Sequence, residues 1–137
     1  MSPCRFCEIA AGQLPANVIW ADEDVVVFLD VRPLLKGHTL VVPRAHVATF
    51  GDLPTDRLAT LFAVVQRICR AVEVGLGAEG AFVAMNNKVS QSVPHVHVHV
   101  VPRKHKDGLR GFFWPRVRYE GDAERDAFAE RIRAALG

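Results

Sequence analysis

The stretch His95-Val96-His97-Val98-His99-Val100-Val101-Pro102 decides how this chain can fold and what it can do. Its strict alternation predicts a β-strand with unlike faces, in which the three histidines project from one side. The β-branched valines suit a strand and give its other face apolar surface for the core. A lone histidine would most simply be a buried core residue. Three histidines in alternation favour a functional role instead, because imidazoles can serve as nucleophile, cation and metal ligand near neutral pH.

The composition limits the class of protein. The chain has 137 residues, half of them hydrophobic, which is enough for one domain with a core and short for two. Its net charge of +2 argues against nucleic acid or an anionic membrane as the main partner. Apolar runs such as 25–29 are far shorter than the roughly 20 residues that span a bilayer. The first residues lack the apolar run of a secretory signal, so we expect a cytoplasmic protein.

Short β-rich runs separated by turn residues predict the other strands. Residues 17–21 and 25–29 flank the acidic turn 22–24 and predict a hairpin. Residues 38–43 predict a third strand that ends at its proline. A fourth strand is expected at 80–86, tightly connected to the histidine strand.

From Thr55 onward the spacing of apolar residues changes to that of a helix. One continuous stripe contains Leu58, Leu61, Phe62, Val65, Ile68, Cys69 and Val72. Thr55 is the expected N-cap, and Gly75 and Gly77 the expected stop. Apolar residues at helical spacing predict another helix at 122–136. The predicted fold is therefore α+β, with an antiparallel sheet of about five strands, a long central helix packed on it and a C-terminal helix closing a single domain 1–137 (core 4–102, extension 103–137).

The histidine strand, with Gln91-Ser92-Val93-Pro94 leading into it, resembles the histidine triad (HIT) family of nucleotide hydrolases and transferases, whose motif is His-φ-His-φ-His-φ-φ with φ apolar. The segment 36–46 resembles the family's Gly-His-x-Leu-φ-φ-Pro-x-x-His. Residues 28–31 resemble its nucleoside pocket. The resemblance covers residues 4 to about 116 and implies the HIT-like fold.

The resemblance implies a role for each matching residue. His97 would attack an α-phosphate and form a covalent nucleotidyl-histidine, while a main-chain carbonyl near His95 holds its far nitrogen. His99 and His38 would stabilise charge on the phosphoryl oxygens, with Gln91 also placed in the catalytic set. The expected nucleotide-binding residues are Phe28, Leu29, Asp30, Val31, Asn87 and Ser92. For Asp30 the alternative is a simple turn residue. Because the loop 86–91 is shorter than in many relatives, either Asn86 or Asn87 could reach the phosphate.

Cys4 and Cys7 are a second chemical feature. Alone, a Cys-x-x-Cys could be half of a zinc site, a redox pair or two small buried residues. The resemblance completes a zinc set, because some family members with these cysteines carry zinc. Cys4, Cys7, His46 and His95 would then form a closed, structural site.

The predicted function is hydrolysis of purine nucleotide conjugates, either nucleoside phosphoramidates or dinucleoside polyphosphates, by a homodimer. One rival is a nucleotide-binding interaction module in which turnover is incidental. Another is a metallohydrolase that uses the three strand histidines as ligands of a catalytic metal. The aromatic segment 109–116 is expected to be hydrophobic cover or a dimer contact. Alternatively Trp114 and Arg116, with Arg103 and Lys104, shape the pocket for the leaving group.

Overall fold

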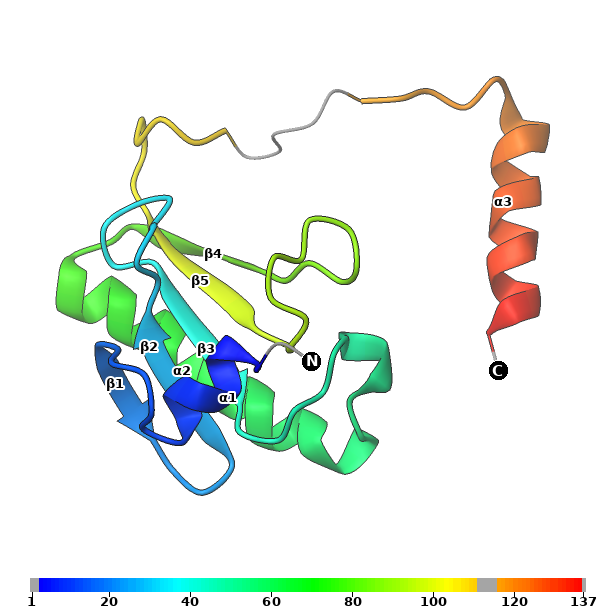
Figure 1. The fold of residues 1–137 in the computed structure, drawn as a ribbon. Coiled ribbons are helices and arrows are strands. Elements are labelled where there is room, and N and C mark those ends of the chain that lie inside the picture. The colour runs from blue at the N-terminus through cyan, green and yellow to red at the C-terminus, as the bar shows by residue number, and fades with distance from the viewer. Residues whose placement is uncertain (1–2, 111–115, 137) are drawn as a thin grey trace. The chain divides into compact units, whose positions relative to one another are not determined.

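The computed structural model describes residues 3–110 and 116–136, and its elements form the predicted α+β fold (Figure 1). Five strands make one antiparallel sheet in the order β1-β2-β3-β5-β4. The strands are β1 (Val18–Ala21), β2 (Val25–Leu29), β3 (Thr39–Pro43), β4 (Gly80–Ala84) and β5 (Val98–Arg103). The other elements before residue 108 are the helices α1 (Arg5–Ala10) and α2 (Leu58–Leu76) and the 3-10 turns η1 (Phe50–Asp52) and η2 (Thr55–Arg57). The predicted hairpin is confirmed, because β1 and β2 pair antiparallel.

The histidine strand is shorter than predicted. β5 begins at Val98, so the prediction of a strand over 95–102 was wrong at its start. The reason is a different set of hydrogen bonds, since the amide of Val96 donates to the carbonyl of Val47 at 2.7 Å rather than to the ladder with β3. From Val98 on, β5 pairs with β3, and His99 lies opposite Leu40.

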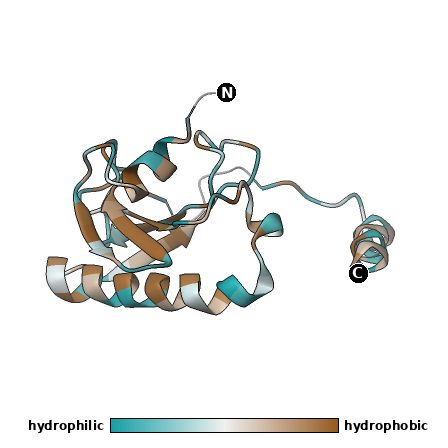
Figure 2. Ribbon diagram, turned by 60° about the horizontal axis from the view of Figure 1, so that its bottom comes forward, coloured by the Kyte–Doolittle hydropathy of each residue, from teal (hydrophilic) through white to brown (hydrophobic). Residues whose placement is uncertain are grey.

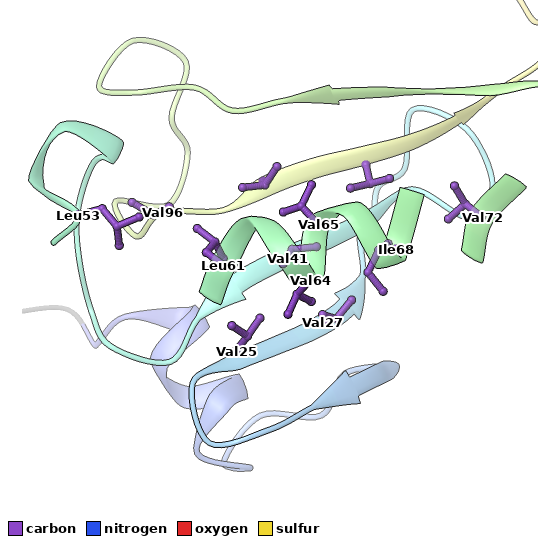
Figure 3. Close-up of a cluster of buried hydrophobic side chains, with 12 residues drawn as sticks. Val25, Val27, Val41, Leu53, Leu61, Val64, Val65, Ile68, Val72 and Val96 are labelled. Carbon is purple, nitrogen blue, oxygen red and sulfur yellow. The ribbon is translucent and has the colours of Figure 1, made fainter. Parts of the chain in front are cut away.

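Helix α2 covers one face of the sheet (Figure 2). The predicted apolar stripe is confirmed, and Leu61 and Val65 are almost fully buried. Figure 3 shows these side chains against alternate valines of the sheet, among them Val27 and Val41. Thr55 is not the N-cap of α2, because η2 precedes the helix and Arg57 occupies the cap position without a side-chain cap.

Helix α1 packs on the other face of the same strands. Phe6 and Ile9 pack with Val26 and Leu40. Along their strands these two residues alternate with the valines that face α2. Each central strand is therefore apolar on both faces, which explains why β2 and β3 read as nearly continuous hydrophobic runs. The histidine segment lies beside α1, where Phe6 makes edge contacts with the rings of His95 and His97.

The chain divides into two compact units, residues 1–107 and 108–137. The second unit contains α3 (Asp122–Ala135), which confirms the predicted C-terminal helix. Within it the ring of Tyr119 contacts that of Phe128 at 5.9 Å between centroids. That the whole chain forms a single domain stays a prediction, and Trp114 lies outside the described residues. No helix in the described ranges has both the length and the apolar character that crossing a bilayer requires.

Candidate active site

His97 is held in one tautomer by the main chain. Its Nδ1 lies 2.7 Å from the carbonyl oxygen of His95, and the side chain is only 5% exposed. A carbonyl oxygen can only accept a hydrogen bond, so Nδ1 must carry the proton. In the neutral ring Nε2 then has a free lone pair. A main-chain carbonyl at this position is what the family resemblance implied, while the nucleophilic role of His97 stays a prediction.

His99 and His38 form a second pair beside His97. The rings of His97 and His99 lie 4.9 Å apart between centroids, and His38 Nε2 is 2.9 Å from His99 Nδ1. Burial, with smaller effects of His97 and His38, lowers the pKa of His99 to about 4. Burial also lowers the pKa of His38, against the opposing effect of Asp30, whose carboxylate lies 3.6 Å from His38 Nε2. Both shifts favour the neutral form of these imidazoles, in which each ring can donate one hydrogen bond and accept another.

A cavity of about 510 Å³ opens in front of His97 and His99. This volume lies within the range of small-molecule sites. Its other lining residues are Arg5, Phe6, Ile9, Pro15, Ala16, Phe28, Leu29, Asp30, Val31, Arg32, Leu40, Ser92 and Val93. Apolar side chains of α1 and β2 form much of the wall, and Asp30 is the one acidic group among the described lining residues. An apolar wall with a few converging polar groups suits a nucleoside.

The structure brings most of the predicted nucleotide-binding residues to this cavity. Phe28, Leu29, Asp30, Val31 and Ser92 all line it. His38 is not among the described lining residues. Its Nε2 contacts Nδ1 of His99, and the ring of His99 lines the cavity.

Gln91 and Asn87 are not among the lining residues. Gln91 donates through Nε2 to the carbonyl of Ala48 at 2.6 Å and accepts the amide of Lys88 at 2.8 Å. Asn87 Oδ1 accepts the amide of Phe50 at 2.7 Å. These hydrogen bonds join the side chains of Gln91 and Asn87 to the main chain. The roles of both residues at phosphate stay predictions. Arg103 and Lys104 do not line the cavity either, and Arg103 pairs with Asp107.

Helix α1 supplies a cavity wall that the sequence analysis missed. Phe6 is 6% exposed, and its ring lies 5.0 Å from that of His97 and 5.4 Å from that of Phe28. A signal was present, because Phe6 stands between Cys4 and Cys7. In the structure, the segment that places those cysteines beside His95 also places Phe6 next to His97.

The four predicted metal ligands converge on one point. His95 Nδ1 lies 3.3 Å from Cys4 Sγ, 3.5 Å from Cys7 Sγ and 3.2 Å from His46 Nδ1. His95 Nε2 donates to the carbonyl of Pro43 at 2.7 Å, which leaves the lone pair of Nδ1 directed at the cluster. Neighbouring ligand atoms of a tetrahedral zinc site are about 3.5 Å apart, given its bond lengths of about 2.0–2.3 Å. The donor set and its spacing therefore fit a metal such as zinc.

The strand histidines do not share one metal centre. In the described ranges, His95 belongs to the cysteine cluster, whereas His99 lies with Asp30 and His38 in a separate group. His97 is in neither group. This division disfavours the rival reading in which all three histidines hold a catalytic metal.

The structure is an α+β fold in which His97 and His99 line a cavity of small-molecule size. Comparison with known proteins gives the family. The HIT domain model matches residues 11–106, so the chain belongs to the HIT family. An uncharacterized HIT-like protein of Mycobacterium tuberculosis is 38% identical over 98% of this chain and 93% of its own length. The adenosine 5'-monophosphoramidase hnt1 of Schizosaccharomyces pombe is 32% identical over 82% of this chain and 83% of its own.

Solved structures agree with the fold. A HIT family protein from Bacillus subtilis superposes with a TM-score of 0.89 at 31% identity, over 99% of both chains. A zinc-bound histidine triad family protein from Mycobacterium smegmatis superposes with a TM-score of 0.74 at 40% identity, over 96% of both chains. The family relationship supports a nucleotide hydrolase or transferase as the kind of protein.

Proposed function

We propose that this chain is a hydrolase that acts at the α-phosphate of purine nucleotide conjugates, either nucleoside phosphoramidates or dinucleoside polyphosphates. The observation that carries the proposal is the 2.7 Å hydrogen bond from His97 Nδ1–H to the carbonyl of His95. It leaves an unprotonated Nε2 on a ring that lines the cavity. A histidine with that tautomer fixed is an activated nucleophile.

The reaction would proceed in two displacements. His97 Nε2 forms a bond to the α-phosphorus, and the bond from phosphorus to the leaving group breaks with its electron pair on the leaving atom, which takes a proton from solvent. Water then attacks the nucleotidyl-histidine and releases its proton to solvent. The phosphorus–nitrogen bond breaks and restores neutral His97, and the products are a nucleoside monophosphate and the free leaving group.

The neighbouring residues would stabilise the substrate and the developing charge. A preorganised donor such as His99 lowers the barrier because it already faces the place where charge forms. Asp30 Oδ1 accepts the amide of Arg32 at 2.9 Å, which leaves Oδ2 available for ribose hydroxyls. Phe6, Ile9 and Phe28 offer apolar surface for the base.

The relatives guide the choice of first substrate. The S. pombe relative is named as an adenosine 5'-monophosphoramidase, and an Arabidopsis thaliana relative, 32% identical over 77% of this chain and 55% of its own length, as an adenylylsulfatase. In both names a non-carbon group is attached to an adenylyl phosphate. Adenosine 5'-phosphoramidate is therefore the substrate to test first.

Cys4, Cys7, His46 and His95 would hold a structural zinc ion. Four protein ligands leave no open coordination position, so the ion would stabilise the fold and take no substrate. The zinc-bound M. smegmatis relative supports this assignment. We also propose a homodimer and a cytoplasmic location. The dimer is compatible with an edge strand, β4, which has no strand beyond it in the described sheet.

Trapping of the covalent intermediate tests the function. The protein is mixed with adenosine 5'-phosphoramidate labelled at phosphorus and quenched in alkaline detergent, because histidine–phosphorus bonds are acid-labile. We expect label on His97, and none in His97→Ala, which should still bind adenosine monophosphate. His105→Ala is the matched control, since His105 is exposed and pairs with Glu79 away from the described lining of the cavity. Product formation without any labelled His97 would disprove the mechanism, and binding without turnover by the native protein would favour the interaction module.

A further inference from the structure

The turn between β2 and β3 connects its main chain to the histidine pair. The amide of Leu34 donates to His38 Nδ1 at 3.0 Å. The turn is closed by two further bonds, from the amide of Asp30 to the carbonyl of His38 at 2.9 Å and from the amide of His38 to the carbonyl of Leu35 at 3.0 Å. The amide of Leu34 is therefore held in place by the same turn that carries His38.

This single hydrogen bond determines where the protons lie on two rings. An amide N–H can only donate, so His38 Nδ1 must be unprotonated and its Nε2 must carry the proton. That N–H then donates to His99 Nδ1 across 2.9 Å. With Nδ1 of His99 accepting, the proton of neutral His99 must be on Nε2. Within the described residues His99 Nε2 has no hydrogen-bond partner, and the ring lines the cavity.

We propose that the main-chain N–H of Leu34 is a positioning group which, through His38, places the proton of His99 on Nε2, where it can donate to a phosphoryl oxygen of the substrate. The catalytic part of this inference rests on the proposed function. The placement of the protons does not, because it follows from the contacts alone.

The alternative proton arrangement shows why the amide matters. If both imidazoles exchanged tautomers, His99 Nδ1–H would donate to His38 Nε2, and the hydrogen bond between the rings would survive. His99 Nε2 would then direct a lone pair at the phosphoryl oxygens and repel them. The hydrogen bond from Leu34 makes the two arrangements unequal, because in the second arrangement Leu34 N–H would face another N–H. Asp30, at 3.6 Å from His38 Nε2, also favours a proton on that nitrogen.

The position of the turn is fixed by packing. Gly37 has φ of +97°, and a Cβ on it would lie 2.5 Å from Leu76 Cδ1 at the end of α2 and 3.2 Å from Pro102 Cγ of β5. The turn therefore fits closely against α2 and β5. The side chain of Leu34, by contrast, is 55% exposed, so the contribution of this residue to the site is its amide.

The test removes the N–H and changes little else. An amide-to-ester replacement at Leu34, introduced as the α-hydroxy analogue of leucine, exchanges N–H for oxygen and retains the side chain. The matched control is the same replacement at Leu35, whose own N–H donates to no acceptor among the described residues. The carbonyl of Leu35, which accepts the amide of His38, is preserved. Leu34→Pro, which also lacks the N–H, is a second variant.

The first readout is the tautomer of each histidine, measured by long-range ¹H–¹⁵N correlation without substrate. The native protein and the Leu35 ester should show protons on Nε2 of His38 and of His99. In the Leu34 ester, and in Leu34→Pro if it folds, we expect a substantial population with the proton on Nδ1 of His99. Unchanged tautomers in a folded Leu34 ester would overturn the inference, whatever the activity.

The second readout is hydrolysis of adenosine 5'-phosphoramidate. Loss of a correctly directed donor should lower kcat by roughly 10- to 100-fold, with KM changed much less. An equal fall of kcat in the Leu35 ester would indicate general damage to the turn and would overturn the catalytic role. If the native protein shows no hydrolysis at all, the proposed function fails, while the shifted tautomers still support the placement of protons by Leu34.

Discussion

His95 and His97 share a hydrogen bond that joins two sites: the carbonyl of His95 accepts Nδ1–H of His97 at 2.7 Å, while the imidazole of His95 lies among Cys4, Cys7 and His46. One residue therefore contributes its side chain to the metal cluster and its main chain to the nucleophile. Anything that displaces His95 should affect both.

Removal of metal should lower stability and activity together. With free zinc at roughly 100 times its dissociation constant, binding contributes about 2.7 kcal/mol to the free energy of unfolding, which chelation would remove. Cys7→Ser should show the same loss and bind less zinc, whereas Cys69→Ala should retain native zinc content and chelator sensitivity. Metal analysis and thermal unfolding with and without chelator measure this. A protein purified without zinc, with a Tm indifferent to chelator, would rule out the site.

Asp30→Asn should weaken binding through the ribose. Hydrogen bonds to a charged group contribute about 1.5–3 kcal/mol, so the affinity for adenosine monophosphate should fall roughly 10- to 100-fold. The dideoxy nucleotide, which lacks both ribose hydroxyls, should bind the native protein and Asp30→Asn equally weakly. Calorimetric titration provides the comparison, with the exposed Asp56→Asn as control. If Asp30→Asn lost affinity for both nucleotides in equal proportion, Asp30 would not contact the ribose.

The fold could be predicted from the sequence because each kind of element leaves its own pattern. Alternation indicated the histidine strand, β-rich runs bounded by turn residues located the other strands, and the stripe from Leu58 to Val72 located α2. The predicted start of α2 was wrong because Thr55–Arg57 forms a 3-10 turn that leads directly into the helix at Leu58. The start of β5 was wrong because the partner of Val96 is the loop carbonyl of Val47. No side-chain pattern reveals such a partner.

The candidate site was predicted in part, for a related reason. The alternation of histidines indicated the histidine row, and the resemblance to the HIT family supplied the four residues of the metal cluster. Phe6 was missed because an isolated aromatic residue looks like ordinary core. The amide of Leu34 was missed because a main-chain donor has no signature in the sequence. The hydrogen bonds of Gln91 to Ala48 and Lys88 depend on the shape of the loop and could not be predicted from its composition.

Acid should destabilise the protein partly through His99. Its pKa is about 4 in the folded chain against 6.5 as the ordinary value, so between these pH values the unfolded chain binds more protons. Stability from the neutral ring is therefore complete above about pH 6.5 and is lost as pH falls toward 4. Denaturant unfolding at pH 7 and pH 5 should show a smaller loss for His99→Gln than for the native protein. Identical losses would show that His99 does not contribute.

The core beneath the sheet should be sensitive to single deletions. Leu61 is 1% exposed and lies between β-sheet valines and the rest of α2 (Figure 3). Leu61→Ala should lower the free energy of unfolding by about 2–5 kcal/mol, because it removes buried surface and leaves a cavity. Val74→Ala on the same helix should change it by less than about 0.5 kcal/mol, since Val74 is 87% exposed. Urea unfolding of both variants checks the contrast, and equal losses would contradict this packing.

Phe6 should matter for the nucleotide more than for the metal. Its ring contacts both His97 and Phe28 at the cavity wall, while its neighbours Cys4 and Cys7 point to the metal cluster. Phe6→Ala would open the wall beside the base and release the ring of His97, so we expect a higher KM and a lower kcat for adenosine 5'-phosphoramidate. Phe6→Leu, which retains most of the apolar volume, should restore much of KM. Zinc content should stay native in both variants, because all four ligands remain. Loss of zinc together with the higher KM would mean instead that Phe6 acts by holding α1 in place, and an unchanged KM in Phe6→Ala would remove it from the binding wall.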